Sequence, residues 1–249
     1  MIHGAFVGGW YYRWLKPWFT ERGHVCHAPD LRHHEQGTWA PREFAGVGLP
    51  EYRADLRALI GTLDEAPIIV GHSMGGLIAQ QLAEDGLAAA LVLLAPCGPW
   101  GILPGSTSEI GAAMHLLNQG DYWNRILLPD PSVAAAMALD RVRPELRDTA
   151  LGLMRPESGR AIFQTIHWGM DWSMASAVDH RKVECPVLCI AGKADQVVSP
   201  GTVRSVASKY RKVSTYEEIP WLSHFIAGEP AGDGVPDIVM AWLDDVLPH

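Results

Sequence analysis

Short runs of apolar and β-branched residues alternate along this chain with longer stretches in which apolar residues recur at helical spacing. The short runs predict strands at His24–Ala28, Ile68–Val70, Leu91–Ala95, Val187–Ala191 and Ser214–Ile219. The longer stretches predict helices at Trp10–Glu21, Leu49–Leu63, Met74–Asp85, Thr202–Tyr210 and Val235–Val246. Because strands that alternate with helices form parallel sheets with helices on both faces, the pattern predicts an α/β fold with a mainly parallel central sheet.

The alternation stops between residues 98 and 182. Four helical patterns and no strand pattern occupy this stretch: Glu109–Asn118, Ser132–Leu139, Pro144–Met154 and Glu157–Ile166. A stretch of about 85 residues is too long for a loop inside a compact domain. We therefore expect residues 98–182 to form a helical cap, inserted into a core made of residues 1–97 and 183–249.

Composition limits the possible partners and the compartment. The chain has 249 residues, of which 48% are hydrophobic and 19% charged, as in ordinary globular proteins. A net charge of −8 disfavours binding to nucleic acid or to acidic membrane surfaces. No apolar run is long enough for a membrane helix, and MIHGAFVGGW lacks the pattern of a signal peptide. The four cysteines form no CxxC pair, so we expect reduced thiols and a cytoplasmic protein: Cys26, Cys97, Cys185 and Cys189.

The segment from Gly71 to Gly75 reads Gly-His-Ser-Met-Gly, a G-x-S-x-G motif with a predicted strand before it and a predicted helix after it. A serine at such a sharp strand-to-helix turn presents its hydroxyl to solvent. The glycines let neighbouring backbone pass close to the turn, and the helix N-terminus favours negative charge beside Ser73. Since adjacent residues at such a turn point in different directions, we expect His72 to support the site rather than to act as its base.

Gly-His-Ser-Met-Gly-Gly, residues 71–76, resembles the nucleophile elbow of the α/β-hydrolase superfamily, in the form found in small serine esterases and lipases. Further matching blocks spread the resemblance over the core: His3-Gly4, Asp30-Leu31-Arg32, Gly192–Asp195 and His224. The resemblance implies an α/β-hydrolase fold and Ser73 as nucleophile. One departure concerns the N-terminus, where relatives have a full strand before the His-Gly pair and this sequence has Met1 and Ile2.

A serine nucleophile needs a base and a carboxylate that orients it, and in this fold they follow in the order serine, acid, histidine. Asp195 ends a tight turn after a predicted strand, and the other position that relatives use, 95–98, holds no carboxylate. His224 follows the last strong strand. Relatives often have an acidic residue and proline after this histidine, which Glu229-Pro230 match. Trp221 and Ser223 depart from the small residue or glycine that usually precedes it.

The oxyanion formed in acyl transfer needs two amide donors. We expect one from Met74, directly after the nucleophile. The resemblance places the second in the loop that begins His3-Gly4, where Ala5 is the candidate and Phe6 the alternative.

The insertion is rich in tryptophan, methionine and phenylalanine, which line adaptable apolar pockets. The candidate pocket residues are Phe6, Trp100, Trp123, Met137, Trp168 and Met170. Because no cluster of Arg or Lys stands out in the insertion, we expect a largely apolar, uncharged substrate. The predicted function is hydrolysis of a carboxylic ester of a small molecule through an acyl-enzyme, without metal or other cofactor.

Several other chemistries use the same scaffold. Lactonase, thioesterase and amidase activities stay open. Epoxide hydrolases and haloalkane dehalogenases need an aspartate at the position of Ser73, and related hydroxynitrile lyases have lysine at the position of Phe225. Carbon–carbon bond hydrolases often have asparagine, and cofactor-free peroxidases an aromatic residue, where this chain has His72. A ligand-binding receptor with little turnover is the alternative outside enzymes.

Overall fold

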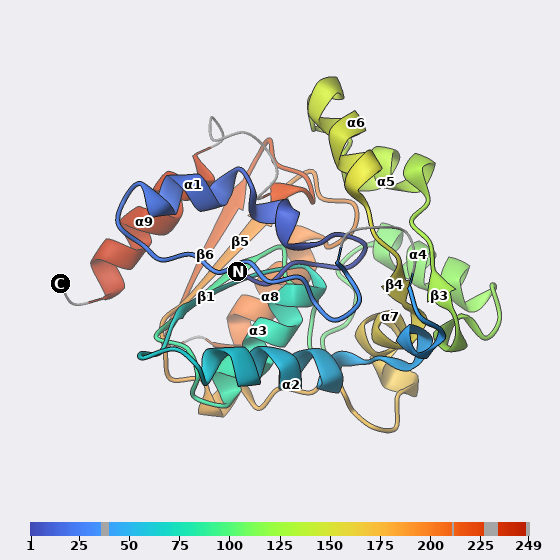
Figure 1. The fold of residues 1–249 in the computed structure, drawn as a ribbon, viewed down its shortest axis with the longest axis horizontal. Coiled ribbons are helices and arrows are strands. Elements are labelled where there is room, and N and C mark those ends of the chain that lie inside the picture. The colour runs from blue at the N-terminus through green and yellow to red at the C-terminus, as the bar shows by residue number, and fades with distance from the viewer. Residues whose placement is uncertain (36–39, 211, 227–233, 248–249) are drawn as a thin grey trace.

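The central sheet has four parallel strands in the order β1-β2-β5-β6 (Figure 1). The computed structural model describes residues 1–35, 40–210, 212–226 and 234–247. Its sheet strands are β1 (Ile68–His72), β2 (Ala90–Leu94), β5 (Val187–Gly192) and β6 (Ser214–Ile219). Beside β1, Ile2 forms a single parallel bridge, in which its amide donates to the carbonyl of Val70 at 2.7 Å. The chain before the His3-Gly4 pair is thus joined to the sheet edge by one residue.

Two hydrophobic cores lie on the two faces of this sheet. Along β2, Leu91 and Leu93 belong to one core, whereas Val92 and Leu94 belong to the other. The first core is covered by α2 (Leu49–Ile60), α3 (Met74–Glu84) and α8 (Pro200–Lys209). The second is covered by α1 (Leu15–Thr20) and α9 (Val235–Val246), which lie together in Figure 1. Burial on both faces explains why these strands are apolar runs without alternation.

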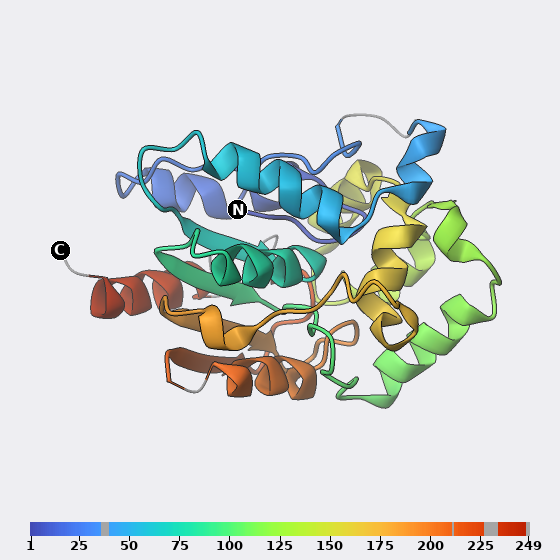
Figure 2. The same cartoon turned by 90° about the horizontal axis from the view of Figure 1, so that it is seen from below.

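Residues 98–182 gather at one end of the sheet (Figures 1 and 2). They form α4 (Thr107–Leu117), α5 (Pro131–Met137), α6 (Pro144–Leu153) and α7 (Gly159–Ile166). Short 3-10 helices occur here and in the core, at Gly9–Tyr12, Arg42–Gly46, Tyr122–Asn124, Trp168–Met170 and His180–Lys182. Ser106 and Glu109 form a capping box that starts α4. The same Glu109 accepts hydrogen bonds from the Ser199 amide at 2.5 Å and the Thr202 hydroxyl at 2.9 Å, which fastens α4 to the start of α8.

Three predictions about these elements are wrong. The stretch His24–Ala28 forms no strand, and Val25 within it is 85% exposed. The single Ile2 bridge on that side of β1 offers almost no ladder for a further strand to join. The predicted helix Trp10–Glu21 is divided into a 3-10 helix and α1, because Pro17 has no amide hydrogen to continue a helix from residue 10.

The third error concerns the insertion, which was expected to contain no strand. It holds a short antiparallel pair, β3 (Ile126–Leu127) and β4 (Glu157–Ser158). Strands of two residues are too short to show a period-two pattern in the sequence.

Candidate active site

Ser73 lies at the turn between β1 and α3. Its backbone has φ 53° and ψ −122°, a conformation that costs energy for any residue with a side chain. The turn is fixed on both sides, since the Ser73 amide donates to the Leu94 carbonyl at 3.1 Å and the Ser73 carbonyl accepts from the Cys97 amide at 3.0 Å. A Cβ at Gly71 would lie 2.6 Å from the Gly75 carbonyl oxygen, so glycine is required there. The first turn of α3 follows directly, and its amides favour negative charge near the hydroxyl.

His224 and Asp195 come from loops after β6 and β5 and meet beside Ser73. The Ser73 hydroxyl lies 3.1 Å from His224 Nε2, and His224 Nδ1 donates to Asp195 Oδ2 at 2.8 Å. Asp195 Oδ1 accepts the amides of Val197 and Val198, both at 2.8 Å. All three residues of the series are buried, with 6–7% of each residue exposed. The structure therefore brings together the three residues that the sequence named, with the carboxylate held by its own loop and the imidazole held by the carboxylate.

His72 braces the loop that carries His224. Its Nε2 donates to the His224 carbonyl at 2.8 Å, and its ring stacks on Tyr11 with centroids 4.4 Å apart. Burial and the neighbouring His224 hold the pKa of His72 well below its usual range, so the ring is neutral. This bond fixes the backbone that carries His224, and the role of His72 as a support of the base stays a prediction.

The loop after His3 packs directly against the nucleophile. A Cβ at Gly4 would lie 2.9 Å from the Ser73 Cβ. His3 fixes the loop, because Nδ1 donates to the Gly4 carbonyl at 2.8 Å while Nε2 accepts the Leu31 amide at 2.9 Å. Phe6 has φ 63° and its carbonyl accepts from the Arg155 amide at 2.8 Å.

The amides of Ala5, Phe6 and Met74 make no hydrogen bond to another described residue. They are therefore free to act as donors to an oxyanion. Ala5 or Phe6, with Met74, stay the predicted pair.

A thiol lies next to the candidate nucleophile. Cys97 Sγ is 3.7 Å from Ser73 Oγ. Burial raises the pKa of Cys97 to about 12, so the thiol stays protonated and does not compete as a nucleophile. The sequence predicted Cys97 to be a reduced thiol but did not predict its contact with Ser73.

A buried ion pair that the sequence did not predict joins β4 to the core. His34 Nε2 donates to Glu157 Oε2 at 3.0 Å, and Tyr52 and the Ser158 amide donate to Oε1 at 2.7 and 2.8 Å. His34 is only 1% exposed. Burial alone would lower the pKa of His34, and the charge and hydrogen bond of Glu157 outweigh it and raise that pKa.

The aromatic residues predicted to line a pocket make several separate contacts. Trp100 and Trp168 pack edge to face with centroids 5.4 Å apart, whereas Trp123 packs on Phe163 at 5.2 Å. Met170 is 52% exposed. Their role as a substrate pocket, with Phe6 and Met137, stays a prediction.

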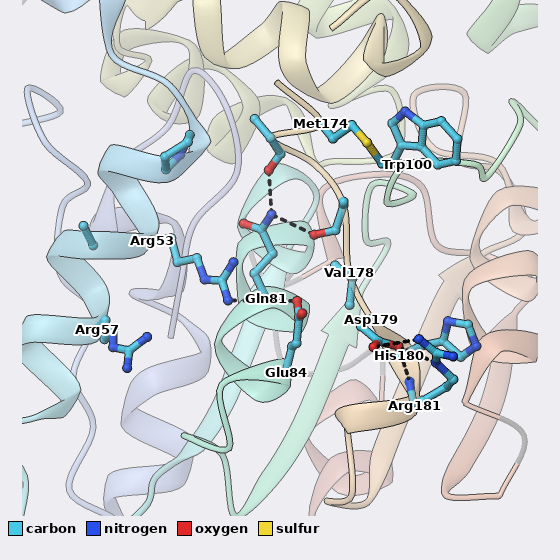
Figure 3. Close-up of a pocket in the computed structure, with 14 residues that line it drawn as sticks. Arg53, Arg57, Gln81, Glu84, Trp100, Met174, Val178, Asp179, His180 and Arg181 are labelled. Atoms are coloured by element: carbon cyan, nitrogen blue, oxygen red, sulfur yellow. Dashed lines mark hydrogen bonds and ion pairs between the residues drawn. The ribbon is translucent and has the colours of Figure 1, made fainter. Parts of the chain in front are cut away.

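A groove of about 880 Å³ lies away from the Ser73 hydroxyl, between α2, α3 and the segment 174–181 (Figure 3). Trp100 lies at its border. Its three arginines are already paired: Arg53 and Arg57 with Asp85 at 2.7 and 3.3 Å, and Arg181 with Asp179 at 2.8 Å. Because Ser73, His224 and Asp195 do not line it, we do not assign the reaction to this groove.

Other predictions concern metals, membranes and the end of the His224 loop. Among the described residues, no group of histidine, cysteine and carboxylate side chains could hold a metal ion. No described helix is long and apolar enough to cross a membrane. Glu229 and Pro230, which match the pattern after the catalytic histidine of relatives, lie outside the described residues.

Comparisons with known proteins give a family and two similar proteins. The family model described as "Alpha/beta hydrolase family" matches residues 1–233. A pyrethroid hydrolase from Sphingobium wenxiniae is 31% identical over 107 residues, which span 42% of this chain and 38% of that protein. The 30 kDa subunit of magnesium chelatase from Rhodobacter capsulatus is 26% identical over 98% of this chain and 86% of its own length.

Solved structures resemble the chain along its whole length. Tomato methylketone synthase I, in complex with 2-tridecanone, has a TM-score of 0.75 and 17% identity, covering 99% of this chain and 97% of its own. A methylesterase from Arabidopsis has a TM-score of 0.70 and 17% identity, covering 98% and 95%. These likenesses support the same fold.

Proposed function

Since this chain belongs to the alpha/beta hydrolase family and has its fold, we propose that it is a serine hydrolase that cleaves a carboxylic ester through an acyl-enzyme on Ser73. The observation that carries the proposal is the hydrogen-bonded series from Ser73 through His224 to Asp195. The names of two similar proteins, a methylesterase and a pyrethroid hydrolase, support hydrolysis as the reaction.

The geometry suggests how acylation proceeds. His224 Nε2 removes the proton of the Ser73 hydroxyl as the oxygen attacks the ester carbonyl carbon. Asp195 keeps the other proton on Nδ1 and stabilises the imidazolium that forms. The negative oxygen of the tetrahedral intermediate is stabilised by the Met74 amide and by the amide of Ala5, with Phe6 as the alternative.

Collapse of the intermediate expels the alcohol, which takes its proton from His224. A water molecule, deprotonated by the same imidazole, then attacks the acyl-enzyme. A second tetrahedral intermediate releases the carboxylic acid and returns the proton to Ser73. The overall reaction consumes one ester and one water and yields one alcohol and one acid.

The decisive experiment combines labelling with turnover. Wild-type protein should hydrolyse p-nitrophenyl esters, and a fluorophosphonate probe should modify Ser73, as identified by peptide mass spectrometry. Ser73→Ala should lose both, with kcat reduced by at least three orders of magnitude. Ser176→Ala is the matched control, because Ser176 is also fully buried but lies outside the hydrogen-bonded series. Unlabelled Ser73 in an active protein would place the nucleophile elsewhere.

A further inference from the structure

Arg155 is the one buried arginine among the described residues, with 8% of its surface exposed. Its Nη1 donates to the carbonyl of the preceding Met154 at 3.2 Å, and its Nε is buried without a partner. Several other arginines in the described part of the chain pair with carboxylates, as Arg32 does with Asp55. Arg155 forms no such ion pair there. A buried cation without an anion is unfavourable, so the guanidinium calls for an anion from outside the described residues.

Two buried carboxylates of the protein are already engaged in other hydrogen bonds. Glu157 is two residues away, but its oxygens accept from His34, Tyr52 and the Ser158 amide. Asp195 is bound to His224 and to its own loop. No ion pair joins the Arg155 guanidinium to a carboxylate among the described residues.

The position of Arg155 ties it to the reaction site. Its amide donates to the Phe6 carbonyl at 2.8 Å, within the loop that follows His3. Two residues earlier in that loop, Gly4 packs against Ser73. The guanidinium thus belongs to a residue whose backbone is bonded to this loop, and its remaining exposure leaves it accessible to a small anion.

We propose that Arg155 binds a carboxylate group of the substrate. The inference rests on the proposed ester hydrolysis and deepens it: the substrate is an ester that carries a carboxylate besides the bond to be cleaved. The planar guanidinium suits this group, since two parallel hydrogen bonds can form to the two carboxylate oxygens. The expectation of an uncharged substrate relied on the absence of a cluster of Arg or Lys in the insertion. A single buried arginine can bind a carboxylate without such a cluster, so the proposal replaces that expectation.

The test compares matched esters with and without a carboxylate. Mono-p-nitrophenyl glutarate is compared with p-nitrophenyl valerate for a charge on the acyl side. Acetoxybenzoate is compared with methylphenyl acetate for a charge on the alcohol side. Wild type should favour the charged member of one pair about tenfold or more in kcat/KM, and Arg155→Met should abolish that preference.

Arg160→Met is the control, because Arg160 is five residues further on and is only partly buried. The Arg160→Met variant should keep the wild-type preference for the charged ester. Arg155→Lys keeps the positive charge without the planar guanidinium and should retain part of this preference. It also replaces the methionine variant if circular dichroism shows that variant unfolded.

Two outcomes separate this inference from the proposed function. If wild type hydrolyses no ester of either pair, the proposed function is wrong. If it hydrolyses the neutral esters with no preference for a carboxylate, or if the preference survives loss of Arg155, then ester hydrolysis stands and the role of Arg155 is wrong.

Discussion

Replacing Asp195 by asparagine changes the hydrogen-bond donors of the site while almost preserving its shape. Asp195 Oδ1 accepts two loop amides, from Val197 and Val198, and Oδ2 accepts from His224 Nδ1. Asparagine offers one acceptor oxygen and one NH₂ group. The two loop amides hold the oxygen at the Oδ1 position, so the NH₂ group must face His224. Nδ1 then has to accept, which moves the ring proton to Nε2.

That proton faces Ser73, whose hydroxyl is 3.1 Å away. An imidazole protonated at Nε2 cannot accept the serine proton. We expect kcat to fall about 10,000-fold, which corresponds to about 5 kcal/mol in the activation barrier. Because the loop amides keep their acceptor, the fold should persist and KM should change much less than kcat.

Hydrolysis of a p-nitrophenyl ester under single-turnover conditions measures the acylation step directly. Asp171→Asn is the control, since Asp171 is 7% exposed and accepts from Ser173 and the Ala175 amide, outside the Ser73 series. It should keep kcat within a fewfold of wild type. If Asp195→Asn retains kcat within tenfold, the tautomer argument fails and another group orients His224.

Three further substitutions test the surroundings of the site. His72→Phe keeps an aromatic ring on Tyr11 but removes the donor to the His224 carbonyl, and kcat should fall about tenfold with a small change in Tm. Because burial raises the pKa of Cys97 to about 12, iodoacetamide at neutral pH should leave the wild-type protein active, and rapid inactivation would contradict a protonated thiol. The Cys97→Ala variant should still form the acyl-enzyme, detected by intact-protein mass spectrometry. The raised pKa of His34 means that its pair with Glu157 stabilises the fold fully below the unfolded value of 6.5 and that this contribution is lost as pH rises through the folded value. In urea unfolding at pH 6, Glu157→Gln should lower the free energy of unfolding by about 3 kcal/mol. Above pH 6.5 the variant's free energy of unfolding should decline less steeply with pH than that of wild type, and an equal slope in both proteins would refute the pairing.

The central strands could be predicted because strands buried on both faces consist of short runs of apolar residues, which are visible in the sequence. Four of the five predicted strands, at Ile68, Leu91, Val187 and Ser214, occur within two residues of the expected ends. The segment from His24 has a similar local pattern, yet it forms no strand. A strand depends on a hydrogen-bonding neighbour far away in sequence, and local pattern carries no information about that neighbour.

The three residues that we propose for the reaction could be predicted because each has a local signal. Ser73 lies between a strand and a helix in a glycine-rich motif, while Asp195 and His224 directly follow strands. Parallel strands end at one edge of the sheet, so side chains that follow them tend to meet. His34 and Glu157 carry no such signal, since they are 123 residues apart and each alone reads as a surface residue.

The loop that begins His3-Gly4 shows why specificity is harder to predict than chemistry. Phe6 has a positive φ, which is unfavourable for a residue with a bulky side chain and persists only when surrounding contacts hold it. One such contact is the bond from the Arg155 amide, which comes from the insertion, and β4 that follows it is fixed to the core by Glu157. The conformation of the loop beside Ser73 therefore depends on the contacts between the insertion and the core. Substitutions at this junction should alter substrate preference even where they touch neither Ser73 nor the aromatic residues of the insertion.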